Sequence, residues 1–469
     1  FLALAPVSES RTESQESTEE ERLKRGPAYP AGSQPQPSQS GPEQTTLDAS
    51  SSWPTYRGDN CRSGHTPTSV PADLAVAWEV KPGVKLSSPV VAEGKVLAAA
   101  VDQYTIQAWD AKHGESLRRY TAGARIDSPP TVYGGTAIFG SHDGWVYCVR
   151  LDDGRLVWRF RAAPAERRVG GFGRLESPWP VHGSVLVKDG TACFAAGKSS
   201  FLDGGIAIYG VDAATGEIRY ENCLSGPDPQ AATSQVTSGR MPGAVPDILS
   251  GDETGLYMRH VKLDWQLSTP PPEQFDWAVK GEGHLLAGSG FLDDTLFNRT
   301  IWQYGIRIDR SQMLVTDGGD VYGLRVYEGI SWNCPVHHVG DGHLIFRQDV
   351  SKPVPPPSPQ ESRRLGRIPT ERYAWQSRIP LRVSAMLLSG KPAERLFVAG
   401  VPDAVAPDDP LAFIEGRRGA KLLALDAATG QQTAELSLDA PPVWDGLAAT
   451  HGRIYLTTAD GKLICLAGR

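Results

Sequence analysis

The stretch richest in side chains that could do chemistry is residues 174–205, RLESPWPVHGSVLVKDGTACFAAGKSSFLDGG. It places an acid, a histidine and a lysine at the ends of two short apolar runs that are typical of strands. Side chains of these types, where they converge, can bind a ligand or transfer protons. The alternative is a set of loop hydrogen bonds and turn caps, which the Asp-Gly-Gly of this stretch also fits. The candidate ligand-binding residues are Glu176, Trp179, His182, Lys198, Ser200 and Asp203.

A second candidate stretch is GSGFLDDTLFNRTIWQYG, residues 288–305. Its two adjacent aspartates could bind calcium, because a hard cation prefers oxygen ligands. Adjacent aspartates also cap turns and helix starts, so that alternative stays open. One more histidine, in the alternating run LYMRHVK, is expected to face a channel or the core. The candidates added here are Asp293 and Asp294 as metal ligands, and His260, Arg299 and Trp302 as ligand-binding residues.

The string CPVHHVGDGH at 334–343 has the composition of a zinc site. Neighbouring histidines on a strand point to opposite faces, however, so His337 and His338 cannot both face one ion, and a hairpin turn before His343 explains the string better. The sequence contains no serine-nucleophile elbow, no phosphate-cradling loop and no HExxH. A serine-hydrolase or phosphate-dependent function therefore has no support.

A repeat of about forty residues organises the elements that would position these candidates. Residues 87–122 and 127–162 carry Ser-Pro and glycine in register, and parts of the unit return at 206–220, 421–435 and 446–468. A period of this length indicates a solenoid or a propeller. In the second unit, Gly-Gly, Asp-Gly and Asp-Asp-Gly separate four short alternating runs, as in tight hairpins. Each unit is therefore predicted to be a four-stranded antiparallel sheet.

Four-stranded units of this length close radially into a β-propeller, which leaves only short protected edges. We predict an all-β fold of about seven blades, with six to eight open because the repeat is degenerate between 225 and 380. The last unit, 444–468, lacks a fourth strand, whereas residues 74–80 form an orphan strand in which Trp78 matches Trp158. The N-terminal strand 74–80 should therefore pair into the C-terminal blade and close the ring.

One small residue recurs in the third strand of each unit, where neighbouring backbones must approach closely. The cysteines in this set are therefore predicted to pack rather than to react. The chain has six cysteines, far apart and without CxxC, which excludes a zinc knuckle or redox motif and leaves one or two disulfides open. The recurring small residues are Ala108, Cys148, Gly210, Ala424 and Cys465.

The composition of the chain indicates its class of partner and its domain organisation. The net charge of −7 argues against a nucleic-acid partner, and no apolar run is long enough to span a membrane. The 50 glycines and 37 prolines among 469 residues fit a turn-rich fold. Residues 1–52 are rich in Ser, Glu, Gln and Pro and are predicted to be a disordered arm, beginning at Phe1 as if cut from a longer protein. Residues 53–469 should form one propeller domain, with insertions at 226–243, 268–290 and 351–369.

The string AxDxxxGxxxW, seen as CVRLDDGRLVW at 148–158 and more weakly at 210–220 and 424–434, resembles the repeat of pyrroloquinoline-quinone-like (PQQ-like) β-propellers. This family includes quinoprotein alcohol dehydrogenases and the non-enzymatic propeller lipoprotein of the bacterial barrel-assembly machinery. WPTYRGDNCRSG at 53–64 is similar to the WPxxRG opening of many bacterial proteins of this group, notably from Planctomycetes. The resemblance implies the fold strongly and the function weakly.

In the dehydrogenases, the family pattern includes an adjacent cysteine pair stacked on the quinone, a catalytic aspartate, and Glu and Asn ligands for calcium. This sequence has no adjacent cysteine pair, and it keeps the blade-stapling tryptophan of the repeat only at Trp78 and Trp158. PQQ and calcium are therefore not the favoured cofactors. We expect a periplasmic or secreted, non-catalytic propeller that binds a protein, peptide or glycan. A divergent quinoprotein dehydrogenase and a structural module of a larger chain are the alternatives.

Overall fold

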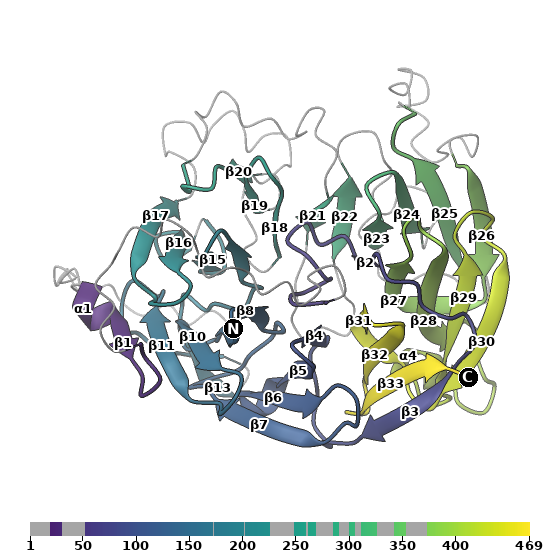
Figure 1. The fold of residues 1–469 in the computed structure, drawn as a ribbon, viewed down its shortest axis with the longest axis horizontal. Coiled ribbons are helices and arrows are strands. Elements are labelled where there is room, and N and C mark those ends of the chain that lie inside the picture. The colour runs from purple at the N-terminus through teal and green to yellow at the C-terminus, as the bar shows by residue number, and fades with distance from the viewer. Residues whose placement is uncertain are drawn as a thin grey trace.

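The protein is all-β, and its sheets are arranged radially around an axis (Figure 1). The structure is a computed structural model. It describes residues 19–30, 52–171, 173–200, 202–225, 248–258, 261–268, 285–289, 300–304, 311–325, 342–352 and 373–469. In this part of the chain the helices are short: α1 (Glu19–Arg22), η2 (Val101–Gln103) and α4 (Ala412–Glu415).

The first four sheets follow each other along the chain and are antiparallel. Blade 1 contains β4 (Val90–Ala92), β5 (Lys95–Ala100), β6 (Thr105–Asp110) and β7 (Ser116–Thr121). Blade 2 contains β8 (Thr131–Tyr133), β9 (Thr136–Gly140), β10 (Trp145–Arg150) and β11 (Leu156–Arg161). Blade 3 contains β14 (Leu186–Lys188), β15 (Thr191–Ala196), β16 (Ile206–Asp212) and β17 (Ile218–Leu224). Blade 4 contains β18 (Leu249–Gly251), β19 (Leu256–Met258) and β20 (Val261–Leu263).

The remaining sheets complete the circle. Blade 5 contains β21 (Leu285–Ser289) and β22 (Ile301–Tyr304). Blade 6 contains β23 (Met313–Thr316), β24 (Asp320–Arg325), β25 (His343–Asp349) and β26 (Trp375–Ile379). Blade 7 contains β27 (Leu381–Ser389), β28 (Arg395–Pro402), β29 (Ala420–Asp426) and β30 (Gln432–Leu438). Blade 8 contains β31 (Pro442–Thr450), β32 (Arg453–Thr458), β33 (Leu463–Gly468) and β3 (Leu74–Val80). The described residues thus form eight blades, at the upper end of the expected six to eight.

The ring closes where the two ends of the domain meet, as predicted. Strand β3 pairs antiparallel with β33, with Leu74 opposite Gly468 and Val80 opposite Leu463. The first strands of neighbouring blades contact one another around the axis, except that β22 of blade 5 contacts β23 of blade 6, and β31 of the last blade contacts β4 of the first. Residues 74–80 therefore join the N-terminal part of the domain to its C-terminal blade.

Tryptophans on the outermost strands of blades 2, 6 and 8 staple these blades to the next one. The indole N–H of Trp158 donates to the carbonyl of Ala213 at 3.1 Å, and that of Trp375 donates to Ala427 at 2.9 Å. Each ring packs on the glycine of the neighbouring turn; a Cβ on Gly216, which has a positive φ, would lie 2.7 Å from the indole of Trp158. Trp375 is a third staple that sequence comparison did not find, because the degenerate repeat of blade 6 hides its register.

The recurring small residues are buried, as predicted, and each lies beside a bulge in the pairing with the fourth strand. Cys148, for example, is fully buried with its Sγ 3.9 Å from the carbonyl oxygen of Ala213 in the next blade. Burial raises the pKa of the Cys148 and Cys193 thiols to about 12. A thiol that stays protonated is a poor nucleophile, so these cysteines act as packing residues.

Two expectations about the chain's organisation need correction. Residues 19–30, predicted to be disordered, contain β1 (Leu23–Arg25), which pairs with β11 at the outer edge of blade 2. Leu23 and Tyr29 pack against the hydrophobic cluster of that blade, and this burial offsets their ordering cost. The expected insertion at 268–290 is also partly structured, since its residues 285–289 form β21. Residues 226–243 and most of 351–369 lie outside the described residues.

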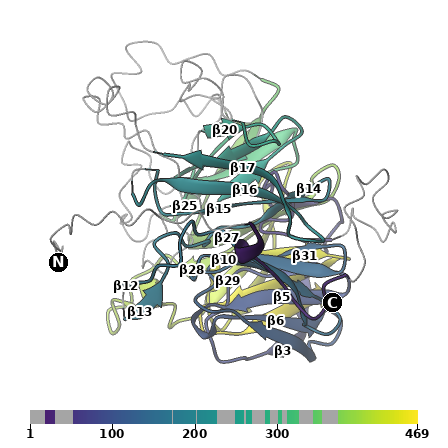
Figure 2. The ribbon, with the colours of Figure 1, turned by 90° about the vertical axis from the view of Figure 1, so that its left-hand side faces the viewer.

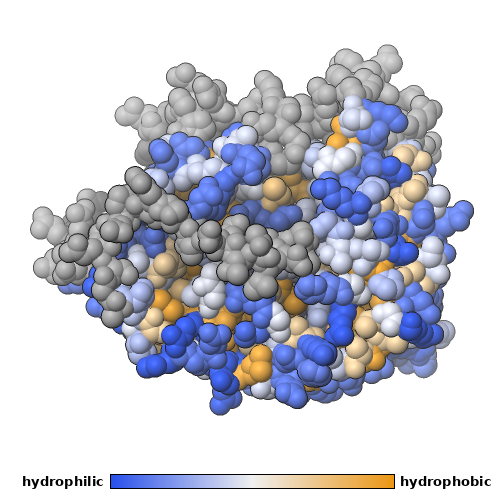
Figure 3. Space-filling view, in the orientation of Figure 1, coloured by the Kyte–Doolittle hydropathy of each residue, from blue (hydrophilic) through white to orange (hydrophobic). Residues whose placement is uncertain are grey.

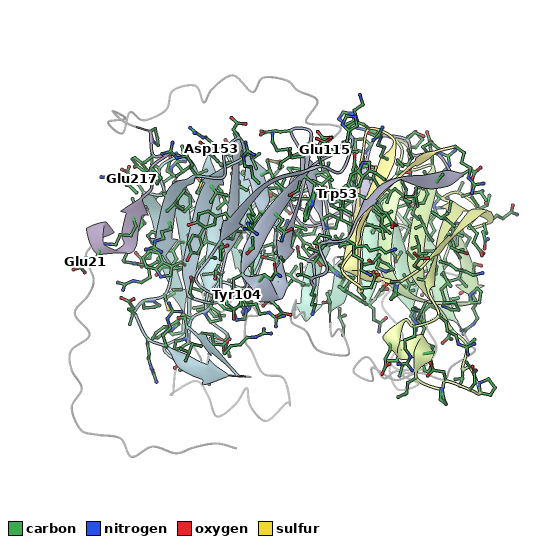
Figure 4. All side chains as sticks on the ribbon, turned by 90° about the horizontal axis from the view of Figure 1, so that it is seen from below. Glu21, Trp53, Tyr104, Glu115, Asp153 and Glu217 are labelled. Atoms are coloured by element: carbon green, nitrogen blue, oxygen red, sulfur yellow. The ribbon has the colours of Figure 1, made fainter. Side chains whose placement is uncertain are left out.

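The propeller has two different faces. The first-to-second and third-to-fourth strand turns lie on what we call the turn face, where Glu115, Asp153 and Glu217 gather in Figure 4. The second-to-third strand loops and the connections between blades lie on the opposite side, the mouth face, where Tyr104 lies. A hairpin of β12 (Val169–Gly171) and β13 (Arg174–Glu176) projects from the mouth face (Figure 2).

Candidate functional site

The segment WPTYRGDNCRSG, residues 53–64, fills the axis of the ring. Trp53 exchanges two backbone hydrogen bonds with Val91 of blade 1, at 2.7 and 2.8 Å. Beyond it, the chain contacts each of the other seven blades and ends in β2 (His65–Thr66), which pairs parallel with β27. We call residues 53–66 the axial plug. Its contacts on blades 2 to 8 are with Val132, Val187, Leu249, Trp302, Thr316, Leu388 and Asp445.

Two buried arginines hold the plug. The Arg62 guanidinium donates to the carbonyl of Leu249 in blade 4 and to the Ser184 hydroxyl beside blade 3, at 2.8 and 2.7 Å, and it also binds back to the plug's own backbone. Burial lowers the pKa of Arg62 to about 10, so it remains charged at neutral pH. Arg57 forms an ion pair with Asp445 of blade 8 at 2.6 Å, and both side chains are 2% exposed. The plug thus links blades that are far apart in the chain.

The plug lies toward the turn face, and Trp53 appears on the side of Glu115 and Asp153 in Figure 4. Its backbone contacts with Gly251, Thr316 and Leu388 fall at the ends of β18, β23 and β27 that lead into the turn-face hairpins. Trp302, a predicted ligand-binding residue, is fully buried, and the Arg57 guanidinium lies 4.4 Å from its ring. Its flat face is therefore covered by the chain itself, and Trp302 is a core residue.

A network of charged side chains lies on the mouth face across blades 1 to 3. His142, in the β9–β10 loop, lies between two carboxylates: its Nε2 is 2.5 Å from Asp127 and its Nδ1 is 3.0 Å from Glu176. Asp127 also pairs with Arg125, and Glu176 pairs with Lys198 of the β15–β16 loop. We call these five residues the mouth cluster. A neighbouring ion pair, Arg174 with Asp102 at 2.6 Å, ties the projecting hairpin to blade 1.

Three residues of the mouth cluster, Asp127, His142 and Glu176, are ionised at neutral pH. Burial alone would lower the pKa of His142, but hydrogen bonds with Asp127 and Glu176 outweigh it and raise that pKa to about 9. Burial likewise opposes the ionisation of Asp127, yet its bond with His142 holds its pKa at about 2. The hydrogen bond with His142 and the proximity of Lys198 hold the pKa of Glu176 at about 2. Because none of these groups titrates near pH 7, the cluster is suited to presenting fixed charges rather than to exchanging protons.

The structure brings three of the predicted residues together: Glu176 and Lys198 in the mouth cluster, and His182 beside it, with its ring centroid 5.9 Å from that of His142. Burial and the positive charge of His142 lower the pKa of His182 to about 4, so it is neutral. Trp179 and Asp203 fit the alternative of loop hydrogen bonds, because the Trp179 indole donates to the Asp203 carbonyl at 2.8 Å.

The other predicted residues do not join the mouth cluster. Ser200 is buried in the β15–β16 loop. His343 begins β25, and its Nδ1 accepts a hydrogen bond from the Val383 amide at 3.1 Å. The remaining candidates lie outside the described residues: His260, Asp293, Asp294, Arg299, His337 and His338. Within the described part of the chain, no group of three or more His, Cys, Asp or Glu side chains is placed to hold a metal ion.

Sequence reasoning missed Arg125, Asp127 and His142. The forty-residue register contains a usable signal, since Asp127 and His142 stand where blade 1 has Ser87 and Asp102. Equivalent positions of the repeat thus carry different polar residues in successive blades, while Ser-Pro and glycine stay the same. Such positions indicate the mouth face.

Aliphatic side chains project from the same face. Leu175, on β13, is 69% exposed, and Leu202, in the neighbouring β15–β16 loop, is 55% exposed. Three more lie on the excursion between β28 and β29 that contains α4: Val405, Leu411 and Ile414. Among the large exposed apolar side chains of the described residues, only Val76 and Tyr133 lie elsewhere. Figure 4 shows α4 and the β12–β13 hairpin projecting on the same side, while Figure 3 shows the opposite, turn face with a largely hydrophilic rim.

Comparison with known proteins agrees with this architecture. Residues 70–245 match the family described as outer membrane protein assembly factor BamB, whose members are built from PQQ-like repeats. The chain carries PQQ-like propeller repeats. The match covers blades 1 to 3 and the strand β3 of blade 8.

Several solved PQQ-like propellers are similar to the chain. The quinohemoprotein alcohol dehydrogenase of Comamonas testosteroni has a TM-score of 0.56 at 14% identity, over 89% of this chain and 81% of that one. The quinohemoprotein alcohol dehydrogenase ADHIIG of Pseudomonas putida HK5 has a TM-score of 0.48 at 11% identity, over 89% and 80%. BamB of Moraxella catarrhalis has a TM-score of 0.35 at 11% identity, over 85% and 98%. At these identities, the first structure supports the fold and says nothing of activity.

No curated protein matches the sequence significantly. Among the described residues, no helix has the length and apolar character needed to cross a membrane.

Proposed function

We propose that this protein is a binding propeller that engages a protein partner through its mouth face. The observation that carries the proposal is the set of exposed aliphatic side chains on two projections of that face, around fixed charges. Exposed apolar groups rimmed by polar ones mark interaction surfaces. Each leucine buried on binding contributes roughly 1.5–3 kcal/mol, and the charges add specificity more than affinity.

A protein or peptide partner fits this surface better than a glycan. The mouth-face apolar residues given above are leucine, isoleucine and valine. Such side chains offer no flat face on which a sugar ring can stack, whereas they pack well against the side chains of another protein. The match to an assembly-factor family points in the same direction, and it suggests a location outside the cytoplasm.

A quinone-dependent dehydrogenase is the second candidate, and the described residues do not fit its cofactor. The sequence lacks the adjacent cysteine pair that the family stacks on the quinone. The flat face of Trp302 near the axis is already covered by Arg57. The mouth-face carboxylates Asp127 and Glu176 are bonded to His142 rather than turned toward a shared metal position. We therefore propose that neither PQQ nor calcium is required.

Site-specific photo-cross-linking in the cells that produce the protein tests the binding function. A benzophenone amino acid replaces Leu202 on the mouth face in one chain and Tyr133 on the turn face in the matched control; both positions are exposed. We expect a discrete protein adduct from position 202 and none from position 133. Adducts of equal yield at both positions, or adducts from position 133 alone, would contradict a mouth-face site.

A further inference from the structure

The outer wall of blade 2 carries a strand that comes from the N-terminal arm. Strand β1 pairs antiparallel with β11, with Leu23 opposite Phe160 and Arg25 opposite Trp158. The pairing continues past the strand, since the amide of Gly26 donates to the Val157 carbonyl at 2.7 Å. Residues 23–26 thus lie on the wall as an extended peptide lies on an open sheet edge, directly after the short helix α1, which ends at Arg22.

Arg22 anchors this peptide in a slot between two blades. Its guanidinium carbon lies 4.9 Å from the centre of the Phe160 ring in blade 2 and 4.7 Å from that of Tyr209 in blade 3. Nε donates to the Arg161 carbonyl at 3.2 Å, and Nη1 lies 3.3 Å from a Glu221 carboxylate oxygen. The side chain is only 11% exposed. Two aromatic rings, a carbonyl and a carboxylate make a binding site for a planar cation.

We propose that this slot and the edge of β11 form a peptide-binding site for a partner segment that carries arginine, then three extended residues and then glycine. In this proposal residues 19–30 are the tethered occupant that such a partner displaces. The site lies on the outer wall and shares no residue with the mouth cluster, so it does not depend on the function proposed above.

The chemistry of the groove defines the required segment. Arginine suits the slot better than lysine, because its flat guanidinium stacks on both rings while its N–H groups reach the carbonyl and the carboxylate. Glycine is required four residues later, because a Cβ on Gly26 would lie 2.1 Å from the Leu156 carbonyl oxygen. Between them, main-chain bonds to β11 accept many side chains, as in other strand-addition sites.

The contacts of the arm in the slot are incomplete. Nη2 of Arg22 is buried without a hydrogen-bond partner, which costs roughly 1–3 kcal/mol, and a partner arginine in the same position would carry the same cost. The arm compensates through its covalent link along residues 31–51, because tethering can give an effective concentration in the millimolar range. A free partner can therefore displace the arm only if it binds the groove more tightly than the tethered arm does, or if the arm's own binding is weakened.

Fluorescence anisotropy with a labelled peptide of residues 19–30, EEERLKRGPAYP, tests this site on the full-length chain. Gly26→Val in the protein blocks its own arm without altering the groove. We expect this variant to bind the peptide roughly 30- to 100-fold more tightly than the wild-type chain, in which the tethered arm competes. The same peptide with Arg22→Lys should bind about ten times more weakly, and Glu221→Gln in the Gly26→Val protein should weaken binding of the arginine peptide.

Three outcomes would overturn the proposal. One is the absence of saturable binding to a Gly26→Val chain whose circular dichroism and melting match the wild type. Another is equal affinity for the arginine and lysine peptides. The third is a wild-type dimer that excess peptide dissociates, since the occupant would then be the arm of a second copy rather than the chain's own.

Discussion

Two ionic networks, one in the axial plug and one on the mouth face over blades 1 to 3, have different surroundings. In the axial plug, Arg57 and Asp445 are both 2% exposed and Arg62 is fully buried, and their bonds join separate blades. In the mouth cluster, His142 is 15% exposed and Lys198 is 42% exposed, and their bonds join adjacent loops of blades 2 and 3. The plug network is thus closed to solvent, whereas the mouth cluster keeps contact with it.

This difference separates a structural role from a binding role. A buried charge that loses its partner keeps its full desolvation cost, so the plug should tolerate little change. Partly exposed ion pairs contribute less to stability, and their charges remain available to an approaching partner. The comparison assigns the buried plug network to holding the ring and the mouth cluster to recognition.

The largest expected effect is at Arg62. Arg62→Ala leaves the Leu249 carbonyl and the Ser184 hydroxyl without their donor, and it opens a cavity between blades 3 and 4. We expect the free energy of unfolding, measured by urea denaturation, to fall by about 3–5 kcal/mol. Arg174→Ala at the mouth is the matched control and should cost less than about 1 kcal/mol. Similar losses for the two variants would remove the distinction between the two ends.

The next effect is at Asp445. Asp445→Asn leaves Arg57 buried without a counter-charge and should lower the free energy of unfolding by about 3 kcal/mol. Asp445 has a φ of +51°, a conformation that asparagine adopts readily, so backbone strain does not confuse the result. Asp445→Ala should cost more, because it adds that strain. An asparagine variant with wild-type stability would show that the pair does not hold the plug.

The mouth cluster should show its contribution through pH. Because the pKa of His142 is raised to about 9, its contribution is complete below its ordinary value near 6.5 and is lost as the pH rises through 9. The pKa values of Asp127 and Glu176 are lowered to about 2, so their contributions are present above about pH 4 and are lost as the pH falls toward 2. The free energies of unfolding of the wild type and His142→Gln, measured as a function of pH, should differ most between about pH 4.5 and 6.5, by on the order of 2 kcal/mol. The two values should converge near pH 10. A difference that does not depend on pH would contradict the assignment.

The smallest effect on stability is expected at the mouth-face leucines. Leu202→Ser and Leu411→Ser should change the free energy of unfolding by less than about 0.5 kcal/mol, because both side chains are more than half exposed. Position 202 should nevertheless lie in the surface that the partner covers. Thermal melting compares the two variants with Leu249→Ala, a buried change in blade 4 that should be far more destabilising.

The sequence predicts the ring well where the repeat is regular. The Ser-Pro and glycine register identifies the blades at 87–162, and the unpaired strand 74–80 predicts its own partner in the last blade. Blade 5 escapes prediction because β21 and β22 lack the Asp-Gly punctuation that marks other hairpins. Its position follows from neighbouring sheets, which is tertiary information.

The candidate site is predicted only in part. Glu176, His182 and Lys198 stand out because they are close in sequence, whereas Asp127 and His142 join them from the preceding blade. The axial plug is recognised as a motif, but its location is not, because two buried arginines in a polar segment read as a solvent-exposed loop. Only closure of the ring supplies the carbonyls and the carboxylate that make their burial favourable.

The claim that the chain fills its own axis, rather than leaving it to a quinone, is tested most directly by titrating the full-length protein with PQQ and calcium. Calorimetry and the quinone absorbance spectrum follow the titration. We predict no saturable heat and no spectral shift, with melting temperature unchanged. One-to-one binding at micromolar affinity, with a shifted quinone spectrum and a raised melting temperature, would contradict it.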